Sequence, residues 1–223
     1  MGLAKVFAQM DKTDEKPLKE AHSRRQITDK DCVRINLGKT YWKAKLSSMK
    51  DKESRQALVR YCERIPEMAK TGSGLIIGGK MGVGKTWAAA SVLKEAVRRR
   101  FPSYFVTHDE LRELQFKDRV FGNGTDGLMV SQKLKEAIFL VVDNLNDPFM
   151  VDKAFGPDHL ERLVSYRNSH RLVTIITTRV AREFKDKVSL FDIVSETMVP
   201  ITLEGENLRD LARQKLAMRV LGE

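Results

Sequence analysis

The eight residues from Gly79 to Thr86 have the types and the spacing of a loop that binds phosphate groups. Gly79 and Gly84 enclose four residues and are followed by a lysine and a hydroxyl residue. Glycines allow successive backbone N–H groups to turn inward around an anion, and a helix that begins at Lys85 would direct its positive dipole end at the same anion. Lys85 is expected to reach the β- and γ-phosphates, and the hydroxyl group of Thr86 to ligate Mg²⁺. The residues expected to contact a nucleoside triphosphate are Gly79, Lys80, Met81, Gly82, Val83, Gly84, Lys85, Thr86 and Trp87.

A second candidate group of residues follows two apolar segments further along the chain. Ile138–Asp143 is expected to be a buried strand that ends in an acid, and Leu172–Thr178 a β-branched strand that ends in threonines. Apolar strands that alternate with helices indicate a parallel sheet covered on both faces, whose ligands gather where the strands end. Asp143 is therefore expected to partner Mg²⁺, usually through water, with Thr177, Thr178 and Arg179 beside it.

The other expected elements complete an α/β fold with a closing basic helix. Strands are expected at Leu75–Ile77, Tyr104–Val106 and Val199–Leu203. Helices are expected after the phosphate loop and at Ser54–Met68, His108–Phe116, Met129–Ala137, Leu160–Arg167 and Asn207–Leu221.

The composition is that of a soluble protein. Of 223 residues, 42% are hydrophobic and 31% are charged, and no apolar run approaches the roughly 20 residues of a membrane span. Met1–Met10 is too short for a signal peptide. Neither the two cysteines nor the four histidines have ligand spacing, so we expect reduced thiols and a cytoplasmic protein with no membrane partner.

The positive charge is concentrated at the start of the chain. Residues 1–70 carry 17 Lys and Arg against 10 Asp and Glu, within a net charge of +10. We expect residues 1–50 to be a basic, mostly helical or partly disordered partner-binding arm and linker, and residues 51–223 to be the nucleotide-binding domain. Within the linker, Tyr41 and Trp42 lie among lysines, which fits either nucleic-acid contact or docking onto the domain. Further candidate DNA contacts are Lys117–Phe121 and Arg213–Arg219, with a solvated surface as the alternative.

Four segments taken together resemble one family. They are Gly74–Ile77 with the phosphate loop, Val141–Leu145, Ile176–Arg179 and Gly205–Arg209. They are similar to the AAA+ helicase loaders of the DnaC and DnaI type and to the related IstB transposition ATPases, over roughly residues 40–210.

This resemblance implies a P-loop NTPase of AAA+ type, with a three-layer αβα parallel sheet, that uses ATP and Mg²⁺. It implies self-association into a ring, spiral or filament on single- or double-stranded DNA, and an N-terminal element that recruits a replicative hexameric helicase, or a transposase partner in the IstB case. It also implies a first sensor at Thr177 or Thr178 and a second sensor arginine at Arg209.

The chain departs from that family at the positions that drive hydrolysis. Asn144 stands where the family has an acid, and a neutral amide cannot take a proton from water. Arg179 stands at or near the sensor asparagine, and Phe191–Ile193 lacks the trans-acting arginine. We therefore expect slow or conditional hydrolysis, with Asp147 as substitute base and Arg182 or Lys185 as substitute cation. The candidate catalytic residues are Asp143, Asn144, Asp147, Thr178, Arg179 and Arg209.

Three hypotheses follow for the function. The chain is a helicase loader of phage or mobile-element type, an IstB-like regulator that forms ATP-dependent filaments on target DNA, or a non-hydrolysing module that binds and inhibits a helicase.

Overall fold

A computed structural model describes residues 25–113, 125–145, 158–179 and 196–221 of the chain. Their centre is a sheet of five parallel strands in the order β2-β3-β4-β1-β5. The strands are β1 (Gly74–Gly79), β2 (Ser103–Thr107), β3 (Phe139–Leu145), β4 (Val173–Thr178) and β5 (Met198–Leu203). Long connections that carry helices join them, as parallel strands require.

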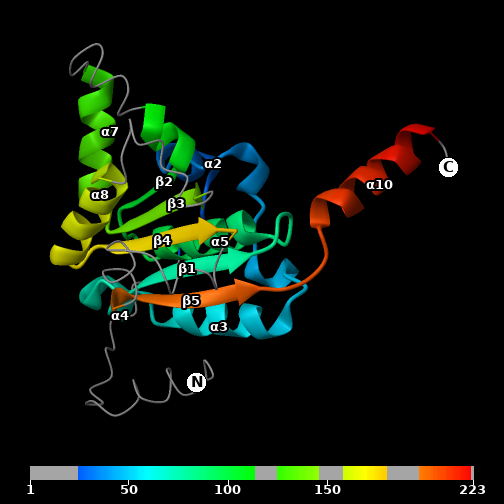
Figure 1. Cartoon of the computed structure of the whole chain (residues 1–223), viewed down its shortest axis with the longest axis horizontal. Coiled ribbons are helices and arrows are strands. Elements are labelled where there is room, and N and C mark those ends of the chain that lie inside the picture. Colours follow the sequence, from blue (N-terminus) through cyan, green and yellow to red (C-terminus); the bar gives the residue numbers. More distant parts are fainter. Residues whose placement is uncertain (1–24, 114–124, 146–157, 180–195, 222–223) are drawn as a thin grey trace.

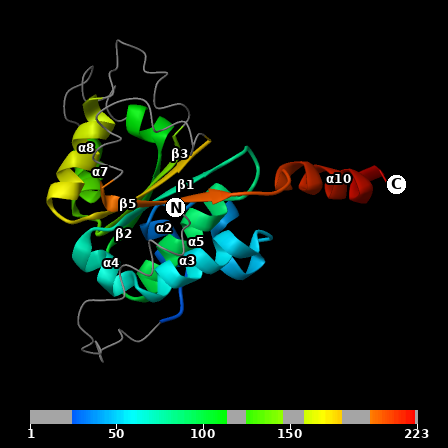
Figure 2. The same ribbon diagram turned by 60° about the horizontal axis from the view of Figure 1, so that its bottom comes forward.

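Helices cover both faces of this sheet (Figure 1). One face carries α3 (Lys52–Glu63), α4 (Ile65–Thr71) and α5 (Lys85–Arg98), and the other carries α7 (Thr125–Glu136) and α8 (Asp158–Ser169) (Figure 2). Each face of the sheet has its own hydrophobic core, and successive strand residues point into opposite cores. Leu75 and Ile77 pack under α5, whereas Ile76 faces α7 and α8. The three-layer αβα architecture expected from the sequence is confirmed.

The expected single helix at Ser54–Met68 is wrong, because the structure has two helices there. Arg64 separates them, with φ −97° and ψ 15°, and Pro66 lies in the first turn of α4. Proline has no N–H to continue a helix but is well tolerated in a first turn. The chain therefore bends at Arg64, and Ile65 and Met68 pack into the same core as α3.

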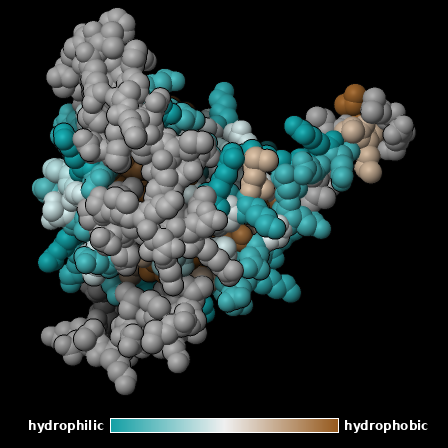
Figure 3. Space-filling view, in the orientation of Figure 1, coloured by the Kyte–Doolittle hydropathy of each residue, from teal (hydrophilic) through white to brown (hydrophobic). Residues whose placement is uncertain are grey.

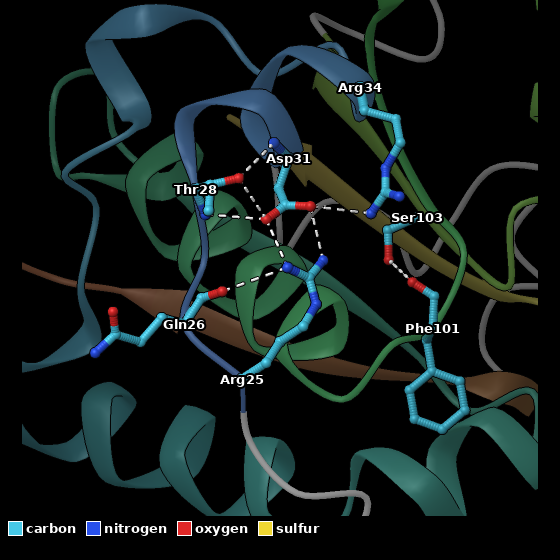
Figure 4. Close-up of polar contacts among 7 residues, drawn as sticks. All are labelled: Arg25, Gln26, Thr28, Asp31, Arg34, Phe101 and Ser103. Atoms are coloured by element: carbon cyan, nitrogen blue, oxygen red, sulfur yellow. Dashed lines mark hydrogen bonds and ion pairs between the residues drawn. The ribbon is translucent and has the colours of Figure 1, made fainter.

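The described chain begins at an ion pair that anchors α2 (Asp29–Arg34). The guanidinium of Arg25 donates to both carboxylate oxygens of Asp31, at 2.6 and 2.7 Å, and Arg34 adds a bond of 3.1 Å (Figure 4). Thr28 and Asp31 form a capping box at the start of the helix. These bonds, led by that of Arg25, hold the pKa of Asp31 well below its usual range. The backbone N–H of Arg25 also donates to the carbonyl of Arg98, so α2 starts beside the end of α5.

The segment between α2 and α3 packs onto the domain. The N–H of Phe105 in β2 donates to the carbonyl of Ile35 (2.8 Å), which covers the outer edge of the sheet. Tyr41 stacks near Phe105 and Trp42 is half-buried against the core, so the docking interpretation of these aromatics is confirmed. The buried Lys94 of α5 donates to the carbonyls of Trp42 and Ala44. The proposed boundary at residue 50 thus follows a segment that shares this core.

The last element, α10 (Leu208–Leu221), begins at the end of the sheet and projects away from the other elements in both views (Figures 1 and 2). Within the described residues, no helix is long and apolar enough to cross a membrane. Cys32 and Cys62 are buried free thiols, and burial raises the pKa of Cys32.

Candidate functional site

The predicted phosphate loop connects the end of β1 to the start of α5. Gly82 has φ 81°, and a Cβ atom there would lie 1.7 Å from Oδ1 of Asn207. The N–H of Leu208, the first residue of α10, donates to the carbonyl of Gly82 (3.0 Å). The start of α10 is therefore seated directly on the loop, and only glycine leaves room for it.

Lys85 lies in the mouth of this loop. Its Nζ donates to the carbonyls of Gly79 (2.8 Å) and Lys80 (2.7 Å). Burial lowers the pKa of Lys85, and the charges of Arg179 and Arg209 lower it further, while Asp143 opposes them. Positive charge from the end of β4 and from α10 thus adds to the charge of Lys85, and this favours binding of an anion at the loop.

Asp143 lies at the centre of a hydrogen-bonded chain beside Lys85. The hydroxyl of Thr86 donates to Oδ2 of Asp143 (3.1 Å), and the hydroxyl of Thr177 donates to Oδ1 (2.6 Å). Burial raises the pKa of Asp143, although the bonds from Thr177 and Thr86 oppose this shift. The residues that the sequence placed at the ends of three separate strands or loops are therefore in contact.

Asn144 occupies an unusual backbone position. Its φ is 61°, at an irregularity of the β3–β4 pairing between Val142 and Leu145. Its N–H donates to the hydroxyl of Thr177 (2.8 Å), and its side chain is exposed. Asparagine tolerates the left-handed region better than most residues. The bulge therefore turns the residue after Asp143 away from the core, toward solvent at the strand ends.

The oxygen atoms present fit a magnesium ion. Mg²⁺ prefers carboxylate and hydroxyl oxygens and retains water and phosphate ligands. Thr86 and Asp143 supply one oxygen of each kind within 3.1 Å of each other. Among the described residues no group of three or more His, Cys, Asp or Glu side chains is gathered, so a cation here would depend on a bound phosphate for further ligands.

Other predicted residues lie elsewhere. The indole N–H of Trp87 faces the linker, where it contacts the carbonyl of Lys45 and the hydroxyl of Ser48 (2.9 Å). Thr178 is buried next to Thr177 at the end of β4. Asp147, Arg182, Lys185, residues 117–121 and residues 191–193 lie outside the described residues.

Asn207 lies at the phosphate loop but was not predicted from the sequence as a residue of the site. Its side chain accepts a hydrogen bond from the N–H of Arg209 (3.1 Å) at the start of α10, a role that its place before a helix could have suggested. Its contact with Gly82 has no local signal, because the two residues are far apart in the sequence.

No protein-family model and no curated protein matches the chain. Solved structures do. The crystal structure of the DnaC helicase loader is 21% identical with a TM-score of 0.61, covering 75% of this chain and 100% of its own. That of DnaI is 22% identical with a TM-score of 0.60, covering 77% and 93%. AMPPCP-bound DnaA from Aquifex aeolicus is 15% identical with a TM-score of 0.59, covering 80% of this chain and 55% of its own.

These likenesses concern the fold. The chain shares the fold of the DnaC, DnaI and DnaA structures, which is the three-layer parallel αβα fold expected from its sequence. The relation to IstB stays a prediction.

Proposed function

Starting from this fold, we propose that the protein is an ATP-binding helicase loader, which assembles on DNA with ATP and recruits or delivers a replicative hexameric helicase. The observation that carries the proposal is the contact of the Thr86 hydroxyl with Asp143 (3.1 Å), next to Lys85 in the glycine-rich loop. A triphosphate with its cation is the common ligand that a glycine-rich loop, a lysine and such an oxygen pair fit together. The similarity to the DnaC loader supports the biological setting.

The chain's own groups have separate tasks in binding. The loop N–H groups and Lys85, whose Nζ contacts the carbonyls of Gly79 and Lys80 in this structure, would hold the β- and γ-phosphates. Arg179, at the end of β4, and Arg209, in α10, would add positive charge. Thr86 and Asp143 would hold Mg²⁺, which would neutralise phosphate charge. Because Leu208 is bonded to Gly82, nucleotide contact at the loop also positions α10.

We propose that hydrolysis is slow. The exposed amide of Asn144 orients water but cannot accept its proton. Asp147 is the candidate substitute base, and Arg182 or Lys185 the candidate cation supplied to a neighbouring copy. Turnover of the parent, Asn144→Glu and Asp147→Ala, each with and without DNA, tests this. Rapid turnover by the parent that is unchanged in Asp147→Ala would contradict both parts.

The proposed partners follow from the loader type. The AAA+ domain self-associates as a ring, spiral or filament on DNA, whether single- or double-stranded, and residues 1–50 contact the helicase. The alternative of a helicase-binding inhibitor is favoured specifically by Asn144, and helicase unwinding distinguishes the two by being stimulated or blocked. Filaments on duplex DNA with ATP would favour the IstB-like regulator.

The direct test is Lys85→Ala. Loss of a charge-assisted contact of this kind weakens nucleotide binding by about 100-fold, measured by titration with a fluorescent ATP analogue. Lys80→Ala is the matched control, because the structure uses the carbonyl of Lys80 and leaves its side chain exposed. Capture of a replicative helicase, with and without ATP, should then depend on Lys85. A Lys85→Ala protein that binds nucleotide, assembles and captures helicase like the parent would refute the proposal.

A further inference from the structure

The opposite edge of the sheet, where the strands begin, carries a row of exposed cations. β2, β3, β4 and β1 are neighbours in that order, and each is preceded within four residues by one exposed basic side chain. We call this row the basic edge; its members are Arg100, Lys135, Arg171 and Lys70. Because neighbouring strands lie about 5 Å apart, the four strand starts span roughly 15 Å. Lys70 and Arg100 lie on the α4 and α5 side of this edge, and Lys135 and Arg171 on the α7 and α8 side.

Backbone contacts hold these segments side by side. The N–H of Phe139 donates to the carbonyl of Pro102 (3.0 Å), and that of Val173 donates to the carbonyl of Ile138 (2.8 Å). A Cβ atom on Gly72 would lie 2.7 Å from Cα of Arg171, so the ends of α4 and α8 touch. The row is therefore part of the rigid domain.

Two members of the basic edge occupy positions that favour glycine. Arg100 has φ 66° and Arg171 has φ 52°. Each follows a helix in a Schellman arrangement: Phe101 N–H donates to Ala96 O (3.1 Å), and Leu172 N–H donates to Arg167 O (2.8 Å). A residue other than glycine at such a position costs about 1 kcal/mol. Strain of this kind motivates a search for function.

The cations of the basic edge are available. Within the described residues none of the four lies within ion-pair distance of a carboxylate. The acids nearest in sequence to Lys70 and Arg100 are engaged: Glu67 is held by Arg64 (2.7 Å) and Glu95 by Arg98 (3.1 Å). Glu136, which is exposed beside Lys135, accepts a hydrogen bond from Gln132 (2.6 Å). The positive charge of this edge is therefore open to a partner.

An aromatic pair extends the basic edge. Tyr166 and His170, both exposed on α8 and just after it, stack with ring centroids 4.1 Å apart, and Nζ of Lys135 lies 5.6 Å from the centroid of Tyr166. The coloured surface at the left margin of Figure 3, where α8 lies, is largely hydrophilic. Cations that track a backbone beside an exposed aromatic surface are the features of single-strand binding.

We propose that the basic edge binds single-stranded nucleic acid, with its cations on successive phosphates and a base on the Tyr166–His170 pair. An acidic protein would also be attracted by the charge, but it has no bases that could stack on the two rings. The proposal does not rest on the nucleotide site, which lies at the other edge, so Lys85→Ala should retain this binding.

The test uses Arg100→Gly combined with Arg171→Gly in the full chain, because glycine suits both backbone positions. Affinity for a fluorescent oligothymidine, measured by anisotropy, should fall roughly tenfold or more. Because two phosphate contacts are lost, the slope of log K against log salt should become less negative by about 1.4. Thermal unfolding should show the variant to be at least as stable as the parent. Lys39→Ala with Lys52→Ala removes the same charge from exposed positions elsewhere and should bind like the parent.

A second variant tests stacking. Tyr166→Leu should weaken oligothymidine binding severalfold without changing the salt slope, since no phosphate contact is lost. The proposal is overturned if the double glycine variant keeps the parent's affinity and slope. It is equally overturned if polyglutamate displaces oligothymidine as well as unlabelled oligothymidine does, because the edge would then be an acidic-protein surface.

Discussion

Both edges of the sheet contain residues with a positive φ, but the types of these residues differ between the two edges. Where the strands end, Gly82 is required because Asn207 occupies the space of a side chain at 1.7 Å. Where the strands begin, Gly72 is required for the same reason, since Arg171 approaches to 2.7 Å. Arg100 and Arg171 have similar dihedral angles yet carry long side chains. Close approach of another segment, more than the dihedral angle, is thus what demands glycine.

The edges differ in charge as well. At the strand ends, Lys85 lies in the phosphate loop, and the hydroxyl of the next residue, Thr86, contacts Asp143, which suits one compact polyanion with its cation. At the strand starts the cations are spread along a row, which suits an extended polyanion. The same sheet therefore offers two kinds of anion site, and both can be tested by mutation.

The largest effect is expected at Arg167, which lies under the basic edge. This side chain is fully buried, and its guanidinium donates to the carbonyls of Leu134 (2.7 Å), Ala137 (2.9 Å) and Val173 (2.8 Å). Burial lowers its pKa to about 9, so it remains charged at neutral pH. Arg167→Leu would leave these carbonyls without their donor and should reduce the free energy of unfolding by about 3 kcal/mol, measured with denaturant.

Lys30→Leu, at an exposed position of α2, is the control and should change stability by less than about 0.5 kcal/mol. Equal losses in the two variants would show that Arg167 does not organise the helix ends that carry the basic edge.

Gly82→Ala should have the next largest effect. The new Cβ meets Asn207 and the residue keeps a positive φ, so we expect a loss of about 2 kcal/mol together with displacement of α10 from the loop. Adding Asn207→Gly removes the clash and should restore about half of the loss, leaving the backbone strain. A double variant no more stable than Gly82→Ala would mean that the close approach is unimportant.

Asn144 should show the smallest effect on stability. Its positive φ suits asparagine and glycine better than glutamate. Thermal unfolding of Asn144→Glu should therefore show a loss of about 1 kcal/mol, whereas Asn144→Gly should be neutral within about 0.5 kcal/mol. If both variants unfold like the parent, the bulge after Asp143 does not constrain which residue stands there.

The sequence predicted the nucleotide edge better than the opposite edge. Gly79–Thr86 predicts a phosphate loop because the chemistry requires particular residues at fixed spacing. Asp143 was predicted because it ends an apolar strand of a parallel sheet, at the edge where Thr86 also lies. The basic edge has no such pattern. Its members lie in four separate segments, and no spacing in the sequence connects them.

Local patterns also failed in two places, although in the first of them Pro66 was a signal within the segment itself. Ser54–Met68 has an uninterrupted helical apolar period, yet Pro66 and the bend at Arg64 divide it. Tyr41 and Trp42 were compatible with nucleic-acid contact or docking, and only the position of β2 and α5 decided for docking.

By itself, the sequence determined the parallel α/β fold, the phosphate loop and the acid beside it, since each depends on residues close together in the chain or on strand polarity. Tertiary structure alone decided that Asn207 sits on Gly82 and that four helix ends bring their cations to one edge of the sheet. Those arrangements depend on which strands are neighbours, and strand order is set by packing of the whole domain and by no single segment.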